Sequence, residues 1–180
     1  MVKFPYPHRT LALAAAALAL LGSSSAALAQ TGQDQHPAFV TQLLTSNEVP
    51  PAASLANGYA ALLVSADGST VYYTVVVTDA STQVTASHIH CCAPAGQNAP
   101  VVIPFCGTPT TPACGSEGVV AEGSFTQASF GATLQGASLG DLIDAIRAGN
   151  VYVNVHTTKY PGGEARGQLM DPSATPQAAE

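Results

Sequence analysis

Two short segments far apart in the chain place histidines in strand-like settings. Ser87-His88-Ile89-His90 contains two of them, and Asn154-Val155-His156-Thr157 contains a third. Residues two apart on a β-strand point to the same face, about 7 Å from each other, so His88 and His90 share a face. Three imidazoles are a sufficient donor set for zinc or copper with an open fourth position. If the two strands meet, His88, His90 and His156 are the candidate ligands of a copper or zinc site, redox-active with copper.

A structural role for the same histidines is the interpretation that we prefer from the sequence alone. Imidazoles also donate hydrogen bonds to loop carbonyls and to carboxylates such as Glu164, and in that role they would fix the loops at the end of a sheet. In a metal site, Glu164 or Asn154 would instead orient an imidazole. Arg166 can form an ion pair with Glu164 or with Glu48. We therefore expect four polar residues to take supporting roles: Glu48, Asn154, Glu164 and Arg166.

Four cysteines lie within 24 residues: Cys91, Cys92, Cys106 and Cys114. In an exported protein disulfides are the first interpretation, and thiolate ligation of a metal beside His90 is the alternative. Adjacent cysteines rarely bond to each other, because the resulting ring strains the peptide between them. We therefore expect Cys91 and Cys92 each to pair with Cys106 or Cys114, in an order that the sequence leaves open.

The motifs of other reaction types are absent from the sequence. It contains no Gly-x-Ser-x-Gly nucleophile elbow, no phosphate-binding loop and no dinucleotide-binding fingerprint. The remaining acidic residues are scattered over predicted turns, the helix and the termini, so no pair of carboxylates is expected to act as acid and base. The sequence thus identifies no catalytic residue and favours a protein that is not an enzyme.

The first 29 residues have the pattern of a signal peptide. Lys3 and Arg9 supply a basic start, residues 11–21 are apolar, and Ala27-Leu28-Ala29 matches a small-x-small cleavage site. The apolar stretch is too short to span a membrane, which takes about 20 residues. We therefore expect cleavage before Gln30, no membrane span in the mature chain, and a secreted or periplasmic protein.

Length and charge limit the partners of the mature chain. Cleavage before Gln30 leaves 151 of the 180 residues, which is the size of one domain. It also removes two of the five basic residues and none of the eleven acidic ones, so the formal net charge changes from −6 to −8. Such a surface cannot neutralise many phosphates, so nucleic acid is excluded as a partner. The expected partner is an unidentified protein or a metal ion.

Short runs of β-forming residues, separated by Gly, Pro and Asp, predict a mainly β fold. The predicted strands are 39–45, 58–65, 71–78, 84–90, 101–105, 118–125, 151–156 and 164–169. One helix is expected, capped by Ser138 with Asp141 three residues later and closed by Gly149. We expect an antiparallel β-sandwich or barrel with one short helix at 39–170, after a flexible segment at 30–38 and before a disordered tail at 171–180.

An ordered series of motifs resembles the CHRD domain, the repeated module of chordin. In chain order these motifs are Asn47-Glu48-Val49-Pro50-Pro51, Gly58, Asp67-Gly68, Ser87-His88-Ile89-His90, residues 142–149, residues 150–157 and residues 161–169. The resemblance implies an immunoglobulin-like β-sandwich, here as a stand-alone secreted protein of bacterial type. It also implies a binding or structural module of unknown ligand; chordin itself binds growth factors. The Cys91-Cys92 pair and the 106–114 insertion depart from the family, which more often has a short Gly-rich loop there.

Overall fold

The structure is a computed structural model, and it describes residues 36–173. The predicted signal peptide, residues 30–35 of the predicted flexible segment and residues 174–180 of the tail lie outside the described residues. The described elements are β1 (Ala38–Leu44), β2 (Asn57–Val64), β3 (Thr70–Thr78), β4 (Val84–Cys91), β5 (Val101–Cys106), β6 (Gly118–Thr126), α1 (Leu139–Arg147), β7 (Val151–Thr157), β8 (Ala165–Gln168), and three short 3-10 turns at Thr45–Asn47, Gln127–Ser129 and Ala132–Leu134.

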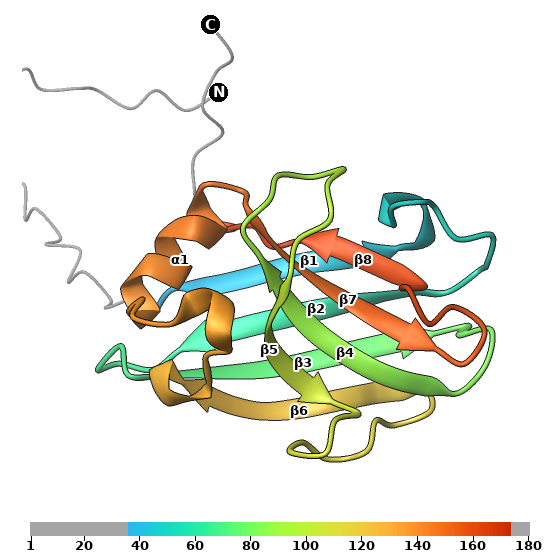
Figure 1. The fold of residues 1–180 in the computed structure, drawn as a ribbon, viewed down its shortest axis with the longest axis horizontal. Coiled ribbons are helices and arrows are strands. Elements are labelled where there is room, and N and C mark those ends of the chain that lie inside the picture. The colour runs from blue at the N-terminus through green and yellow to red at the C-terminus, as the bar shows by residue number, and fades with distance from the viewer. Residues whose placement is uncertain (1–35, 174–180) are drawn as a thin grey trace, which may run out of the picture. The chain divides into compact units, whose positions relative to one another are not determined.

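All eight strands form one antiparallel sheet in the order β5-β4-β7-β8-β1-β2-β3-β6. The sheet curls until its two edge strands approach each other, which gives a nearly closed barrel (Figure 1). The ring of Tyr73 on β3 stacks on Phe105 of β5 with 3.9 Å between centroids, and the Tyr73 hydroxyl donates to the Phe105 carbonyl. The predicted mainly β fold is confirmed, in its barrel form.

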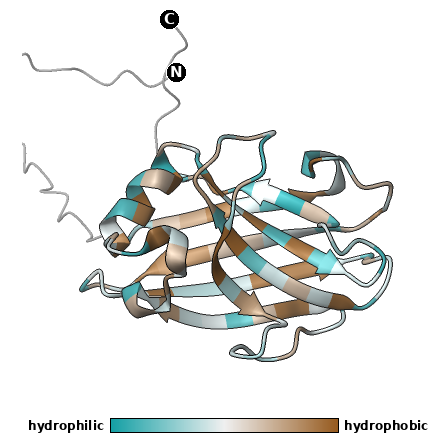
Figure 2. Ribbon diagram, in the orientation of Figure 1, coloured by the Kyte–Doolittle hydropathy of each residue, from teal (hydrophilic) through white to brown (hydrophobic). Residues whose placement is uncertain are grey.

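Alternation along the strands fills the inside of the barrel with aliphatic side chains. On β3, Val71, Val75 and Val77 are at most 2% exposed, and on β7 the residues Val151 and Val153 are fully buried. The hydropathy of the strands alternates accordingly (Figure 2). Burial of this apolar surface, at about 25 cal/mol per Å², is the main force that holds the sheet in its curled form.

The predicted helix is present as α1. Ser138 is its N-cap: the Ser138 hydroxyl accepts from the Asp141 N–H, and the Asp141 carboxylate accepts from the Ser138 N–H. The helix buries Leu142 and Ile146 in the core, and the chain leaves it through Gly149 at a φ of 74°. This positive φ favours glycine and lets the chain turn directly into β7.

The register of three neighbouring strands creates a polar outer face. On β7, Asn154 lies opposite His88 of β4 on one side and opposite Arg166 of β8 on the other. Tyr152, two residues earlier, lies opposite His90 and Gln168. The intervening residues, such as Ile89 and Val153, point into the core. We call this outer surface the polar face; its residues are His88, His90, Tyr152, Asn154, His156, Arg166 and Gln168.

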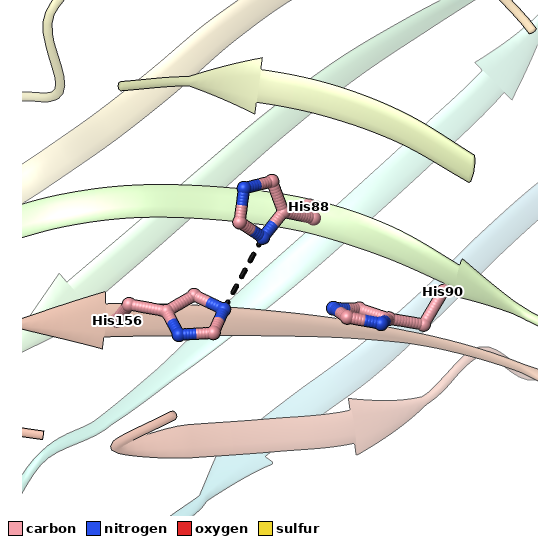
Figure 3. A group of neighbouring side chains, drawn as sticks. All are labelled: His88, His90 and His156. Atoms are coloured by element: carbon pink, nitrogen blue, oxygen red, sulfur yellow. Dashed lines mark hydrogen bonds between the residues drawn. The ribbon is translucent and has the colours of Figure 1, made fainter. Parts of the chain in front are cut away.

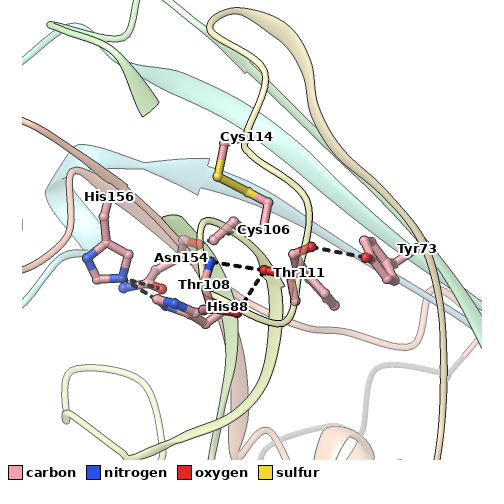
Figure 4. The surroundings of a disulfide bond; sticks show 10 residues. Tyr73, His88, Cys106, Thr108, Thr111, Cys114, Asn154 and His156 are labelled. Carbon is pink, nitrogen blue, oxygen red and sulfur yellow. Dashed lines mark hydrogen bonds between the residues drawn. A yellow bond between two sulfur atoms is a disulfide. The ribbon is translucent and has the colours of Figure 1, made fainter. Parts of the chain in front are cut away.

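The expected pairing of the cysteines is wrong. The structure joins Cys91 to Cys92 and Cys106 to Cys114, the latter at the base of the 107–113 loop (Figure 4). The register of β4 with β5 places Cys106 opposite Ser87, four residues before Cys91. Four strand residues span about 13 Å, whereas a disulfide requires Cα atoms within about 7 Å. Cys114 meets this requirement, because its Cα lies 5.1 Å from that of Cys106.

Candidate functional site

The structure brings the three predicted histidines together on the polar face. His88 Nδ1 lies 3.2 Å from His156 Nε2, across the β4–β7 pairing (Figure 3). One ring nitrogen from each of His88, His90 and His156 lies within 4.8 Å of the other two. His90 is buried, with 7% exposed, and the other two rings are half-buried. The cluster therefore lies at the border between protein and solvent.

Two of these imidazoles are oriented by backbone carbonyls. His90 Nδ1 lies 2.8 Å from the Ala99 carbonyl oxygen, and His156 Nδ1 lies 2.9 Å from the Pro161 carbonyl oxygen. A carbonyl oxygen can only accept, so each Nδ1 must carry the proton and donate it. In the neutral rings both Nε2 atoms then carry lone pairs, and that of His156 lies 3.2 Å from His88 Nδ1, which can donate to it. Metal-ligating histidines are oriented in this way, with the second ring nitrogen donating to a carbonyl or carboxylate.

Asn154 lies between the two oriented rings. Its Oδ1 is 3.0 Å from His90 Nε2 and 3.1 Å from His156 Nε2, and the residue is only 1% exposed. An amide oxygen is an acceptor, as are both Nε2 atoms when Nδ1 is protonated. Lone pairs from three side chains thus converge, with no proton of these three groups placed between them. A cation would satisfy all three.

Burial lowers the pKa of each of the three histidines. That of His88 falls from 6.5 to about 4, through burial and through the neighbouring His156 and His90. The pKa of His90 is lowered by burial, against the opposing effect of its hydrogen bonds to Ala99 and Asn154. The pKa of His156 is lowered by burial, against its hydrogen bond to Pro161 and the charge of Glu48. All three rings are neutral at pH 7, which is the state that binds metals.

A buried ion pair lies next to the histidine cluster. Of the partners that the sequence left open for Arg166, the structure selects Glu48: Arg166 Nη2 lies 2.6 Å from Glu48 Oε2, and both side chains are at most 5% exposed. The guanidinium carbon lies 4.4 Å from the centroid of the Tyr152 ring, and the His90 ring stacks on the same tyrosine at 4.6 Å. Tyr152 thus connects the ion pair to the cluster.

The loop at 92–100 is held over the polar face by the same residues. Arg166 Nη2 donates to Asn98 Oδ1 at 2.6 Å, and Arg166 Nη1 donates to the Gln97 carbonyl at 3.3 Å. The Ala99 N–H donates to the Tyr152 hydroxyl at 3.2 Å. These bonds fix the position of the Ala99 carbonyl, which in turn orients His90. The ion pair therefore acts on the cluster through this loop.

Glu164, predicted as a possible partner of the histidines, has other partners in the structure. Its Oε1 accepts from the Ser54 hydroxyl at 2.6 Å and from the Ser81 N–H at 3.0 Å. Burial raises the pKa of Glu164, but these bonds and one from the Thr157 side chain outweigh that effect and lower it. Glu164 therefore connects the loops at 48–56 and 79–83 rather than orienting an imidazole.

Some groups that shape the site carry no functional signal in the sequence. Alternation places Tyr152 on the same face as Asn154 and His156, but nothing in the sequence indicates that its ring contacts His90 and Arg166. The carbonyls of Ala99 and Pro161 are backbone groups, and residue type carries no signal for them.

The fold and the site define an antiparallel β-barrel domain with a histidine-bearing polar face. A family model, the CHRD domain, matches residues 39–169. The chain therefore belongs to the CHRD family, as the ordered motifs predicted. No curated protein and no solved structure matches the chain. Within residues 36–173, no helix is both long enough and apolar enough to cross a membrane.

Proposed function

We propose that this CHRD protein is an exported metal-binding protein that holds copper or zinc through His88, His90 and His156. One observation carries the proposal: two imidazoles whose Nδ1 atoms donate to carbonyls direct their Nε2 lone pairs at the oxygen of Asn154, and a nitrogen of the third, His88 Nδ1, lies 3.2 Å from His156 Nε2. A cation bound where these atoms meet would satisfy all of them at once.

The chemistry of the donors favours copper or zinc. Imidazole nitrogen is a borderline ligand that suits both metals, and a three-histidine set leaves a further position open. The four cysteines are joined in disulfides, so they provide no thiolate ligands. A zinc ion here would supply a Lewis acid, and copper would add redox activity. The protein's own contribution is to hold the rings neutral and oriented before the metal arrives.

Disulfides and the predicted signal peptide support a location outside the cytoplasm, in the periplasm or beyond the cell. Membership of the CHRD family supports the broader function of a binding or structural module.

Two clefts of about 380 and 300 Å³ flank Glu48 and are of the size that small ligands occupy. The histidines line neither cleft, so a ligand bound there would be separate from the metal.

A purely structural role for the histidines is the competing explanation. If the Asn154 amide turned over, its NH₂ group would donate to both Nε2 atoms and no cation would be needed. The rings would then serve only to fix the Ala99 and Pro161 carbonyls. This role predicts a stable protein without stoichiometric metal binding.

Metal analysis of the protein purified from its native compartment, followed by titration with copper and zinc, separates the two roles. We expect one metal ion per chain, and a loss of affinity of at least about 100-fold in the His88→Ala/His156→Ala double variant. His36→Ala is the matched control, because His36 is an exposed histidine outside the cluster, and it should bind as the wild type does. Circular dichroism verifies the fold of each variant. Absence of stoichiometric binding, or binding unchanged in the double variant, would overturn the proposal.

A further inference from the structure

We propose that Asn154 is the fourth ligand of the metal, through Oδ1, and that a small inorganic anion displaces it. This inference rests on the proposed function and deepens it. It assigns to the site the class of exogenous ligand that it would take.

The distances around Asn154 are short enough for its oxygen to share a metal ion with the imidazoles. In a tetrahedral site with metal–nitrogen bonds of 2.0–2.1 Å, neighbouring ligand atoms are about 3.4 Å apart. Asn154 Oδ1 lies 3.0 Å from His90 Nε2 and 3.1 Å from His156 Nε2. His156 Nε2 is itself 3.2 Å from His88 Nδ1. The amide oxygen therefore lies among the imidazole nitrogens, which are within 4.8 Å of one another.

The oxygen of Asn154 is the weakest donor of this set. Neutral amide oxygens suit hard cations such as calcium, whereas copper and zinc bind imidazole nitrogen more strongly. The position of Asn154 in the middle of β7, between β4 and β8, keeps its backbone fixed, so only its side chain can move away. Displacement therefore costs one weak bond and little rearrangement.

The charges around the cluster favour an anion as the incoming ligand. The three imidazoles and the amide are neutral, and Glu48 is already paired with Arg166. A divalent ion bound here would keep its full charge in a partly desolvated place, which is unfavourable without a counter-charge. An anion that binds the metal supplies that charge. Because Asn154 is only 1% exposed, the anion must be small.

Azide titration of the copper(II)-loaded full chain tests the inference, with absorption and electron paramagnetic resonance as readouts. We expect azide to bind the wild type. In Asn154→Ala, azide should bind about tenfold more tightly, while copper affinity falls by less than about tenfold, because three histidines remain. In Asn154→Asp, which is isosteric and supplies a negative oxygen, copper should bind more tightly and azide about tenfold more weakly. Gln42→Ala, an exposed amide on β1, should behave as the wild type.

The outcomes separate this inference from the proposed function. If copper binds stoichiometrically but azide does not, or if azide affinity is the same in both Asn154 variants as in the wild type, the inference fails and the metal site stands. Complete loss of copper from a folded Asn154→Ala variant would also overturn it, because the amide would then be indispensable rather than displaceable. A wild type that binds no copper and no zinc overturns both.

Discussion

Glu48 and Arg166 are 118 residues apart in the sequence, yet Arg166 Nε donates to Glu48 Oε2 at 2.7 Å inside the protein. The pair joins the segment after β1 to strand β8. Arg166 also donates to Asn98 and Gln97 in the loop that orients His90. One buried ion pair thus connects the stability of the barrel to the geometry of the histidine cluster.

Removing one charge of this pair should lower the stability of the protein more than removing both charges together. Glu48→Leu or Arg166→Met leaves one charge buried without a partner, so each should lower the free energy of unfolding by about 3–5 kcal/mol. The double variant removes both charges and should lose less than the sum of the two single effects. Urea unfolding of the four proteins gives the coupling energy. Additive single effects would mean that the two charges act independently.

The turn at Gly162-Gly163 offers a matched pair of substitutions. Gly163 has a φ of 129°, and a Cβ on it would lie 2.5 Å from Glu48 Oε1. Gly163→Ala should therefore destabilise the protein by about 1–3 kcal/mol from backbone strain alone, and more through the displaced carboxylate. At Gly162 a Cβ would meet nothing within 4 Å. Gly162→Ala should be nearly neutral, and equal midpoints of thermal unfolding for the two variants would contradict this account.

Local pattern was enough to predict most of the fold and the position of the histidines. Alternation placed His88 and His90 on one face, and β-forming runs marked all eight strands within one or two residues. Helix α1 was predictable because Ser138 and Asp141 form a capping box, which depends only on neighbours in sequence. Both features are local: strand faces repeat every two residues, and the helix cap joins residues only three apart.

Features that depend on register could not be predicted in the same way. The cysteine pairing was wrong because it depends on which residue of β4 lies opposite Cys106, and that residue is Ser87. Glu164 and Glu48 were both open partners for Arg166, and only the path of the 48–56 segment decides between them. The orientation of His90 depends on the backbone of Ala99, which has no side-chain signal. To predict any of these three features, one must know how segments far apart in the chain are positioned relative to one another.

Peptide mapping without reductant should confirm the cysteine pairs of the structure. Chymotrypsin cleaves after Phe105, between the two disulfides, once the protein is denatured at mildly acidic pH with its thiols blocked. With Cys91 joined to Cys92 and Cys106 joined to Cys114, the peptides on either side of this cut separate. If either of the first two cysteines paired with either of the last two, the peptides would stay linked until reduction. Mass spectrometry distinguishes these outcomes.

Without metal, the stability of the protein should fall as the pH drops from about 7 to 5. Burial holds the pKa of His88 near 4, against 6.5 in the unfolded chain, and it lowers the pKa of His90 and His156 as well. Below pH 6.5 the unfolded state therefore binds more protons than the folded state, so acid favours unfolding. For His88 this loss runs from about pH 6.5 down to about 4.

The His88→Gln/His156→Gln double variant is the control for this pH dependence. Glutamine is polar, as histidine is, but it binds no proton between pH 7 and 5. The slope of unfolding free energy against pH in this range should therefore become shallower. Most carboxylates have pKa values below this window, which leaves the histidines as its main titrating groups. Urea unfolding at several pH values in the presence of a chelator measures the slope. An equal slope in both proteins would show that the clustered imidazoles are not held neutral by the fold, and it would remove the argument that they are prepared to bind a metal.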